Sequence, residues 1–232
     1  MATGNRDVSS GTDTLRRPAP SAILQANPVV AVLRAGHARE YAPVIAALAD
    51  GGVRSIELTL STAGVFELLP GLIRDFGDQA EIGVGTVTAE TEAGEALDAG
   101  ARFLVTPVTD SAIVRAAAER DIPVFPGGLT PTELFSGWRA GATAVKIFPA
   151  STVGPGYIAQ LRGPFPELAV IPSGGVAIED APGWIRAGAL AVSLGGPLIG
   201  DAFKGGDLSE LTRRAARVSR LVAEARGAGS AG

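Results

Sequence analysis

Residues 51–107 read GGVRSIELTLSTAGVFELLPGLIRDFGDQAEIGVGTVTAETEAGEALDAGARFLVTP, and this stretch decides the fold. Its short apolar runs at 54–60, 81–85 and 102–106 are separated by longer runs of helical character. Short runs rich in β-branched residues are typical of strands. The stretch therefore predicts two successive strand-helix units that lead into a third strand.

The same alternation continues on both sides and predicts eight strand-helix units in all. The other strand candidates are Val29–Arg34, Pro123–Phe125, Ala144–Phe148, Ala169–Pro172 and Ala191–Leu194, and a last helix is expected over Leu208–Ala225. Eight such units are typical of an α/β barrel of the (β/α)8, or TIM, type, and 232 residues suit one domain of this kind.

An open doubly wound sheet also has parallel strands, but its first strand should lead into a glycine fingerprint for nucleotides. Val29–Arg34 is followed by Ala35-Gly36-His37-Ala38, which lacks that fingerprint. The closed barrel is therefore the preferred fold. Its active site should lie where the strands end and the following loops begin.

A weak internal repeat supports the barrel. Similar tetrapeptides stand just before strand candidates at 50–53, 98–101, 139–142 and 186–189, and glycine is the third residue of each. We expect each of these glycines to end a helix in the left-handed region of backbone space, which other residues avoid.

The two ends of the chain differ from the rest. Residues 1–20 are rich in Ser, Thr, Gly and Asp, and residues 227–232 are only Gly, Ala and Ser, so both are expected to be flexible tails. The barrel domain is expected to span 21–226.

Composition excludes several classes of protein. The net charge of −4 offers no broad basic surface for nucleic acid, and without cysteine there is no disulfide or thiolate chemistry. The sequence shows no apolar stretch that would span a membrane and no apolar signal segment, so we expect a cytoplasmic protein without membrane contact.

Lys146 is the first candidate catalytic residue. It stands in the otherwise apolar strand candidate Ala144–Phe148, where a charge is costly. The chain has only two lysines, and the other, Lys204, is expected to be solvated in a Gly-rich turn. Desolvation favours a neutral amine, which attack on a keto group requires. The alternative is a structural ion pair.

Glu57 occupies a similar position on the second strand candidate. Alternation places it opposite Ile56 and Leu58, so it should face the barrel interior if those two face the helices. Schiff-base chemistry needs such a group to shuttle protons. Glu57 could instead only pair with Lys146, and both roles are compatible.

Several ordered motifs between 28 and 196 resemble the family of 2-keto-3-deoxy-6-phosphogluconate (KDPG) aldolases, which includes 4-hydroxy-2-oxoglutarate (KHG) and 2-keto-3-deoxy-6-phosphogalactonate aldolases. The matching pieces are Val32-Leu33-Arg34, Gly52-Val53, Ile56-Glu57-Leu58-Thr59, Gly83-Val84-Gly85-Thr86-Val87, Pro126-Gly127, Thr130-Pro131-Thr132-Glu133, Lys146-Ile147-Phe148-Pro149-Ala150, Gly163-Pro164-Phe165-Pro166 and Pro172-Ser173-Gly174-Gly175-Val176. The resemblance implies a class I aldolase without metal or cofactor, assembled as a homotrimer.

The resemblance also implies the reaction. A 2-keto-3-deoxy sugar acid such as KDPG would be cleaved to pyruvate and an aldehyde, glyceraldehyde 3-phosphate, or 4-hydroxy-2-oxoglutarate to pyruvate and glyoxylate. Lys146 would form the Schiff base and Glu57 would transfer protons. Arg34 and Thr86 would hold the pyruvate carboxylate, and Pro107 would lie against the pyruvate.

Each of these roles has a plainer alternative. An arginine at a strand end is often a solvated cap, and a proline after a strand is often a turn former. Some family members place the carboxylate arginine just after the second strand, where this chain has Ser61-Thr62, and that departure makes Arg34 more necessary. Phe148 beside the Schiff base could equally be plain core.

The ends of the seventh and eighth strands resemble the family's phosphate site. The residues concerned are Ser173, Gly174, Gly175, Gly195 and Gly196. Glycine amides can approach a phosphate closely, although the two turns could also bind nothing. Many members have Gly-Ser at 195–196, so Gly196 loses a hydroxyl. Ser173 replaces a threonine of gluconate-type members and a valine of galactonate-type members, which predicts a gluconate preference.

The sequence leaves two other functions open. An isomerase or epimerase on the same barrel would need paired acids or a metal, and the only histidine, His37, is isolated and is expected at the surface or in a helix cap. A non-catalytic phosphate-binding or assembly barrel would retain the site without the reaction.

Overall fold

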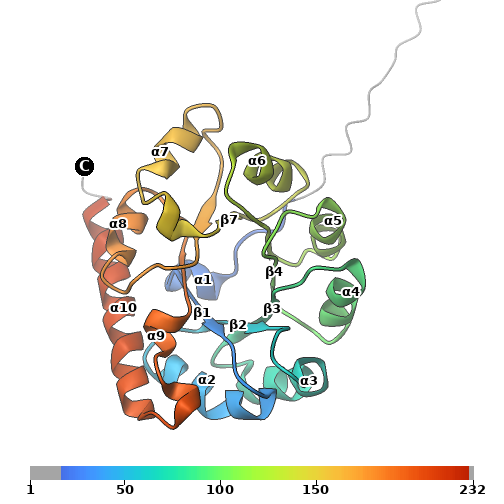
Figure 1. Cartoon of the computed structure of the whole chain (residues 1–232), viewed down its shortest axis with the longest axis vertical. Coiled ribbons are helices and arrows are strands. Elements are labelled where there is room, and N and C mark those ends of the chain that lie inside the picture. The colour runs from blue at the N-terminus through green and yellow to red at the C-terminus, as the bar shows by residue number, and fades with distance from the viewer. Residues whose placement is uncertain (1–16, 230–232) are drawn as a thin grey trace, which may run out of the picture.

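A computed structural model describes residues 17–229 as a ring of short parallel strands surrounded by helices (Figure 1). The strands in this part of the chain are β1 (Val29–Leu33), β2 (Ser55–Thr59), β3 (Glu81–Gly85), β4 (Leu104–Val105), β5 (Val124–Phe125), β6 (Gly127–Gly128), β7 (Val145–Ile147), β8 (Val170–Pro172) and β9 (Val192–Leu194). Each predicted strand contains one of these, which confirms the (β/α)8 barrel.

The fifth strand of the barrel is divided at Pro126. Its first half, β5, pairs with β4, and its second half, β6, pairs with β7. The Pro126 carbonyl itself faces β7 and accepts a hydrogen bond of 2.8 Å from the Lys146 amide. The strand order is β5-β4-β3-β2-β1-β9 in one sheet and β6-β7-β8 in the other, and a bridge between Ser173 and Ser193 joins β8 to β9.

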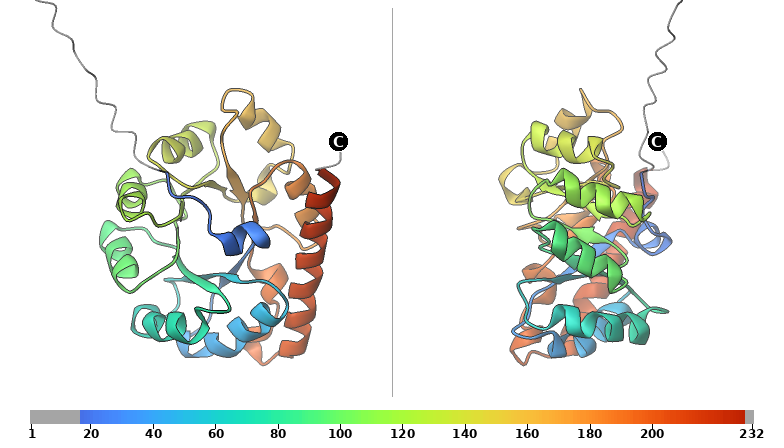
Figure 2. Two further views of the ribbon diagram at one scale, coloured as in Figure 1. Left: turned by 180° about the vertical axis from the view of Figure 1, so that it is seen from behind. Right: turned by 90° about the vertical axis from the view of Figure 1, so that its right-hand side faces the viewer.

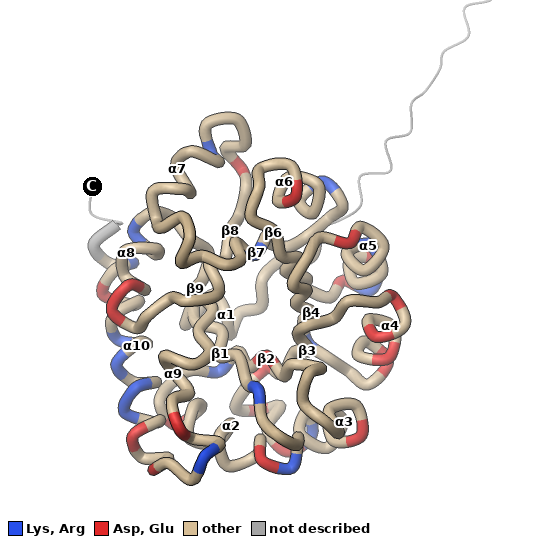
Figure 3. The backbone as a smooth tube through the Cα atoms, in the orientation of Figure 1, with Lys and Arg blue, Asp and Glu red and all other residues tan. Residues whose placement is uncertain are grey.

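The helices form the outer layer (Figure 1). They are α1 (Ala22–Ala26), η1 (Ala38–Glu40), α2 (Tyr41–Asp50), α3 (Val65–Phe76), α4 (Glu90–Asp98), α5 (Ser111–Glu119), α6 (Pro131–Arg139), η2 (Ala150–Thr152), α7 (Tyr157–Arg162), α8 (Ala181–Arg186), α9 (Gly196–Ile199), η3 (Ala202–Lys204) and α10 (Leu208–Gly229). The long α10 packs along α2 and α8. Most charged residues lie on these outer elements (Figure 3), and no helix within 17–229 is long and apolar enough to cross a membrane.

Helix α1 closes the N-terminal end of the barrel, which the sequence did not predict (Figure 2). Its Leu24 is buried in the barrel interior with Phe103, Phe125 and smaller apolar residues. The rings of Phe103 and Phe125 lie 5.8 Å apart between centroids. Ser21 caps the helix by accepting a hydrogen bond from the Leu24 amide. The interior of the barrel is therefore filled by apolar side chains at the N-terminal ends of the strands.

The repeat glycines adopt the expected conformation. The third residue of each tetrapeptide has a positive φ, namely Gly52 (88°), Gly100 (92°), Gly141 (108°) and Gly188 (96°). His37 is the expected cap, since its side chain accepts from the Arg39 amide at the start of η1.

Both ends of the described region are joined to the barrel. Residues 1–16 of the expected N-terminal tail lie outside the described residues. Arg17 lies over the Trp138 ring, 3.4 Å from its centroid, and donates hydrogen bonds to the carbonyls of Trp138 and Ala142. At the other end α10 continues to Gly229. Within the described residues, Arg17 therefore contacts the barrel and the last helix runs to Gly229.

Substitution of Gly83 tests how tightly the barrel interior is packed. A Cβ at this position would lie 2.4 Å from the buried Phe103 ring, so Gly83→Ala should lower the free energy of unfolding by about 1–3 kcal/mol through overpacking. Gly94, inside α4, has open space around it, and Gly94→Ala should raise stability by about 0.5–1 kcal/mol. Urea unfolding of both variants measures the difference, and equal stabilities would contradict this account of the interior.

Candidate active site

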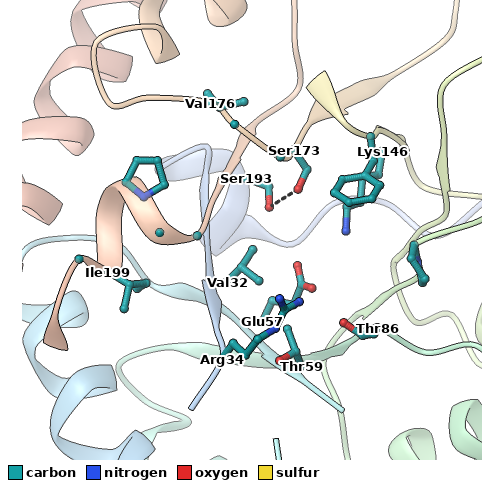
Figure 4. A pocket seen from close by; sticks show the side chains of 18 of the residues that line it. Val32, Arg34, Glu57, Thr59, Thr86, Lys146, Ser173, Val176, Ser193 and Ile199 are labelled. Carbon is teal, nitrogen blue, oxygen red and sulfur yellow. Dashed lines mark hydrogen bonds between the residues drawn. The ribbon is translucent and has the colours of Figure 1, made fainter. Parts of the chain in front are cut away.

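A pocket of about 460 Å³ opens at the carboxyl ends of the strands (Figure 4). Its lining residues come from β1, β2, β7 and β9, from the segments after β1, β3, β4, β7 and β8, and from α9 and η3 after β9. The predicted site residues Arg34, Glu57, Thr86, Pro107, Lys146, Ser173, Gly174, Gly175, Gly195 and Gly196 all line it. The structure thus brings together residues from the first strand to the last.

Lys146 lies in the middle of β7 and is only 8% exposed. Its Nζ lies 5.1 Å from the centroid of the Phe148 ring. On the inner side, Lys146 borders the apolar layer formed by Phe125, Val105 and Ile171. The ammonium therefore points into the pocket from a wall with little water around its stem (Figure 4).

Glu57 lies on β2 and points toward Lys146 across the pocket (Figure 4). It is 1% exposed, and its Oε2 has no hydrogen-bond partner among the described residues. Burial raises the pKa of Glu57, while the positive charges of Lys146 and Arg34 lower it by less. The carboxyl group therefore holds a proton more readily than an exposed glutamate, as a proton-transfer group near neutral pH requires.

A glycine on the neighbouring strand makes room for Glu57. Gly85 lies at the end of β3, and a Cβ there would lie 1.9 Å from Oε1 of Glu57. Any side chain at 85 would displace the carboxyl group. The Gly83-Val84-Gly85 sequence is thus a structural condition for placing a carboxyl group in the barrel interior.

Arg34 follows the end of β1, the strand that pairs with the Glu57-bearing β2, and lies beside Glu57 (Figure 4). Its Nε donates a hydrogen bond of 3.1 Å to Oγ of Ser61, which follows β2. Ser61 in turn contacts the buried Thr59, with 3.0 Å between their hydroxyl oxygens. Ser61 therefore orients the arginine that follows the first strand.

The loops after β3 and β4 contribute Thr86 and Pro107. Thr86 has a φ of 61°, which is rare for a β-branched residue and costs energy. Such strain is kept where the surrounding structure holds it, and here it occurs at a residue that lines the pocket. Strain at this position is consistent with a functional role for the Thr86 backbone or hydroxyl.

Two serines face each other at the ends of β8 and β9. Oγ of Ser173 lies 3.3 Å from Oγ of Ser193, and both residues are buried (Figure 4). The next residues, Gly174 and Gly175, have φ values of 84° and 75°. A Cβ on Gly174 would meet the Phe148 ring at 2.9 Å, so the turn must be glycine to approach the pocket wall so closely.

The pocket also contains residues that were not predicted from the sequence. Ser193 and Thr59 also line the pocket, and Lys204, which we expected in solvent, lines it too. The Ser193 position was detectable by the argument used for Glu57, because it is a polar residue within an apolar strand. Among residues 17–229, no group of three or more His, Asp or Glu side chains could hold a metal ion.

Comparison with known proteins agrees with this geometry. The profile of the KDPG and KHG aldolase family matches residues 21–214. The 2-dehydro-3-deoxy-6-phosphogalactonate aldolase of Escherichia coli K12 is 34% identical over 190 residues, which are 82% of this chain and 91% of that enzyme. The 2-dehydro-3-deoxy-phosphogluconate aldolase of Dickeya dadantii is 33% identical over 82% of this chain and 90% of its own.

The chain belongs to the KDPG and KHG aldolase family. A solved structure of KDPG aldolase from Legionella pneumophila, with pyruvate captured as a covalent carbinolamine, superimposes with a TM-score of 0.78 at 29% identity. That superposition covers 85% of this chain and 97% of the Legionella enzyme. The family resemblance inferred from the motifs is thereby confirmed.

The raised pKa of Glu57 predicts how stability depends on pH in this family member. A native pKa above the ordinary value of 4.5 means that the folded state binds more protons than the unfolded state. The wild type should therefore lose stability relative to Glu57→Gln as the pH rises from 4.5 through the native pKa, and the difference should then level off. Urea midpoints across this range measure the effect.

The exposed Glu119 on α5 provides a matched control for this experiment. Glu119→Gln removes the same charge from the surface and should follow the wild type at each pH. If Glu57→Gln instead loses stability relative to the wild type as the pH rises toward 4.5, in titrations extended below that pH, attraction to Lys146 and Arg34 outweighs burial and the pKa of Glu57 is lowered rather than raised.

Proposed function

We propose that this chain is a class I aldolase that cleaves a 2-keto-3-deoxy sugar acid, preferably one carrying a 6-phosphate. KDPG would give pyruvate and glyceraldehyde 3-phosphate, and 4-hydroxy-2-oxoglutarate would give pyruvate and glyoxylate. The observation that carries the proposal is the pair of Lys146 and Glu57, which point toward each other in the pocket of an aldolase-family barrel.

Lys146 is the nucleophile in this proposal. The amine adds to C2 of the keto acid, and loss of the former carbonyl oxygen as water gives an imine. The protonated imine is an electron sink, so the C3–C4 bond can break with its electron pair moving toward nitrogen. The aldehyde leaves, and the remaining enamine is protonated at C3 and hydrolysed to pyruvate and free Lys146.

Glu57 is the proposed proton-transfer group. Its protonated form donates to the carbinolamine oxygen that leaves as water, and the resulting carboxylate accepts the proton of the C4 hydroxyl when the C3–C4 bond breaks. The same proton is then available for C3 of the enamine. A buried carboxyl group with a raised pKa suits both directions of transfer.

Arg34, Thr86 and Pro107 are proposed to hold the pyruvate end. A guanidinium group can bind a carboxylate through two parallel hydrogen bonds without competing as a nucleophile. The Nε of Arg34 is occupied by Ser61, which leaves the terminal nitrogens for the carboxylate. Thr86 lines the same pocket, and Pro107 supplies an apolar surface.

The distal end of the substrate is proposed to bind at Gly174, Gly175, Gly195 and Gly196. Their backbone lines the pocket without Cβ atoms in the way. Nothing lies within 4 Å of the Cβ position of Gly196, so this side has room for a bulky anion. Assembly as a homotrimer and a cytoplasmic location also remain proposals, to be tested by sedimentation and by cell fractionation.

Covalent trapping tests the proposed nucleophile. Pyruvate with borohydride should label Lys146 and leave Lys204 unmodified, as measured by peptide mass mapping. Lys146→Arg keeps the positive charge but loses the nucleophilic amine, so cleavage activity should fall by orders of magnitude while the fold is retained. Label on Lys204, or none on the wild type, would favour a non-catalytic barrel.

Substrate configuration tests Ser173. Its hydroxyl can bond to a substrate hydroxyl, and we expect higher kcat/KM for the gluconate-configured acid than for its galactonate epimer. Ser173→Val should reduce this preference by about tenfold, since one hydrogen bond contributes about 0.5–1.5 kcal/mol and an unpaired group costs more. Ser173→Thr is the control, because it keeps a hydroxyl at this position. An unchanged epimer ratio in Ser173→Val would rule out Ser173 as the selector.

A further inference from the structure

Both lysines of the chain line the same pocket. The sequence has 20 basic residues, and only Lys146 and Lys204 are lysines. Lys204 ends η3, far along the chain from Lys146, yet both side chains border the pocket of about 460 Å³. Arginine serves for positive charge nearly everywhere else, so the second lysine is as unusual in its position as the first.

The backbone that carries Lys204 is held in place. The neighbouring Phe203 ring packs edge-on against the buried Tyr41 ring, with 5.8 Å between centroids and an interplanar angle of 69°. The Asp201 carbonyl accepts hydrogen bonds from the amides of Lys204 (2.7 Å) and Gly206 (3.0 Å). The start of the Lys204 side chain is therefore fixed relative to β1 and α2.

A second clamp fixes the preceding turn. Arg214 of α10 donates hydrogen bonds to the carbonyls of Leu198 (2.7 Å) and Ile199 (2.9 Å) at the end of α9. These bonds tie α9, which borders the pocket, to the longest helix of the barrel. The segment from β9 to Lys204 is thus built into the fold and not a loose loop.

The ammonium of Lys204 has no protein partner. It forms no hydrogen bond or ion pair with any residue in the described part of the chain, and its side chain is exposed. The charged residues that line the pocket are Arg34, Glu57, Lys146 and Lys204. Three basic side chains and one carboxyl group give the pocket an excess of basic groups in a chain with a net charge of −4.

This excess of basic groups suits a substrate with two anionic groups. In the proposed function, Arg34 binds the carboxylate and Lys146 the keto carbon at one end. The glycines at 195 and 196 offer backbone amides at the other end, and Gly196 has no hydroxyl. Lys204 is the cation on the segment that follows these glycines, beside Gly200 and Phe203 in the pocket wall.

We propose that Lys204 binds the phosphate monoester at the distal end of the substrate and makes the enzyme prefer phosphorylated 2-keto acids. The proposal rests on the proposed aldolase function. An ammonium on a flexible stem binds phosphate as a point charge and can follow it during the reaction. Lys204 thereby offsets the missing hydroxyl at Gly196, so the preference for phosphate is retained.

Steady-state kinetics test this role. KDPG, unphosphorylated 2-keto-3-deoxygluconate and 4-hydroxy-2-oxoglutarate are compared on the wild type, Lys204→Ala, Lys204→Arg and Arg115→Ala. Lys204→Ala should lower kcat/KM for KDPG by roughly tenfold, the effect of one charge-assisted hydrogen bond, and change the unphosphorylated substrate by less than about twofold. Lys204→Arg should retain most of the activity with KDPG. Arg115, exposed on α5 outside the pocket lining, controls for net charge.

The opposite results are equally clear. Equal losses on both substrates, no loss with KDPG, or a loss confined to 4-hydroxy-2-oxoglutarate would overturn the proposal, the last because it would assign Lys204 to a distal carboxylate. The loss should also shrink as ionic strength rises, because salt screens an exposed charge.

A binding measurement separates this proposal from the aldolase function. Titration calorimetry with inorganic phosphate at low ionic strength should show a dissociation constant roughly tenfold higher for Lys204→Ala than for the wild type or Arg115→Ala. Unchanged phosphate binding would overturn the role of Lys204 even if pyruvate labels Lys146. Failed labelling with intact Lys204-dependent binding would overturn only the aldolase function.

Discussion

The structure depends on placing two ionisable groups, Lys146 and Glu57, in the apolar interior of a barrel. Burial of either alone would be costly, and each reduces the cost of the other while both keep access to one pocket. The neighbouring strand β3 makes room for these groups because it has glycine, without a side chain, at two positions. Gly83 lies beside Phe103 and Gly85 lies beside Glu57. A filled apolar layer beneath the pair then leaves the pocket side as the polar side.

Much of the barrel could be predicted because its strands are buried on both faces and its helices end in glycine. These local rules located the polar positions on β2 and β7 and every described strand except β6, which lies beyond the strand candidate Pro123–Phe125. They could not locate the change of partner at Pro126, because pairing depends on the neighbouring strands and not on the local sequence. Nor could they predict that Leu24 of a five-residue helix enters the barrel, since so short a segment has no periodicity to read.

The residues of the candidate site likewise include some that were predictable from the sequence and some that were not. Arg34, Glu57 and Lys146 were accessible from the sequence because each is a charge at or within an apolar strand. Lys204 was not, because a lysine in a Gly-rich turn is ordinarily solvated, and only the three-dimensional closure of the ring brings the segment after β9 next to β1. Family motifs identified the glycine turns but could not indicate that Lys204 lines the same pocket.

Helix α1 closes the barrel at the N-terminal ends of its strands. Leu24 and the phenylalanines fill one end, so molecules reach Lys146 only from the strand-end side. For the proposed reaction, the fragment attached to the lysine is the deeper one and the aldehyde is the shallower one. Departure must then be sequential: the aldehyde clears the opening first, and pyruvate follows once water has entered behind it. Accumulated pyruvate would consequently re-enter the pocket and compete with incoming substrate for the same site at Lys146.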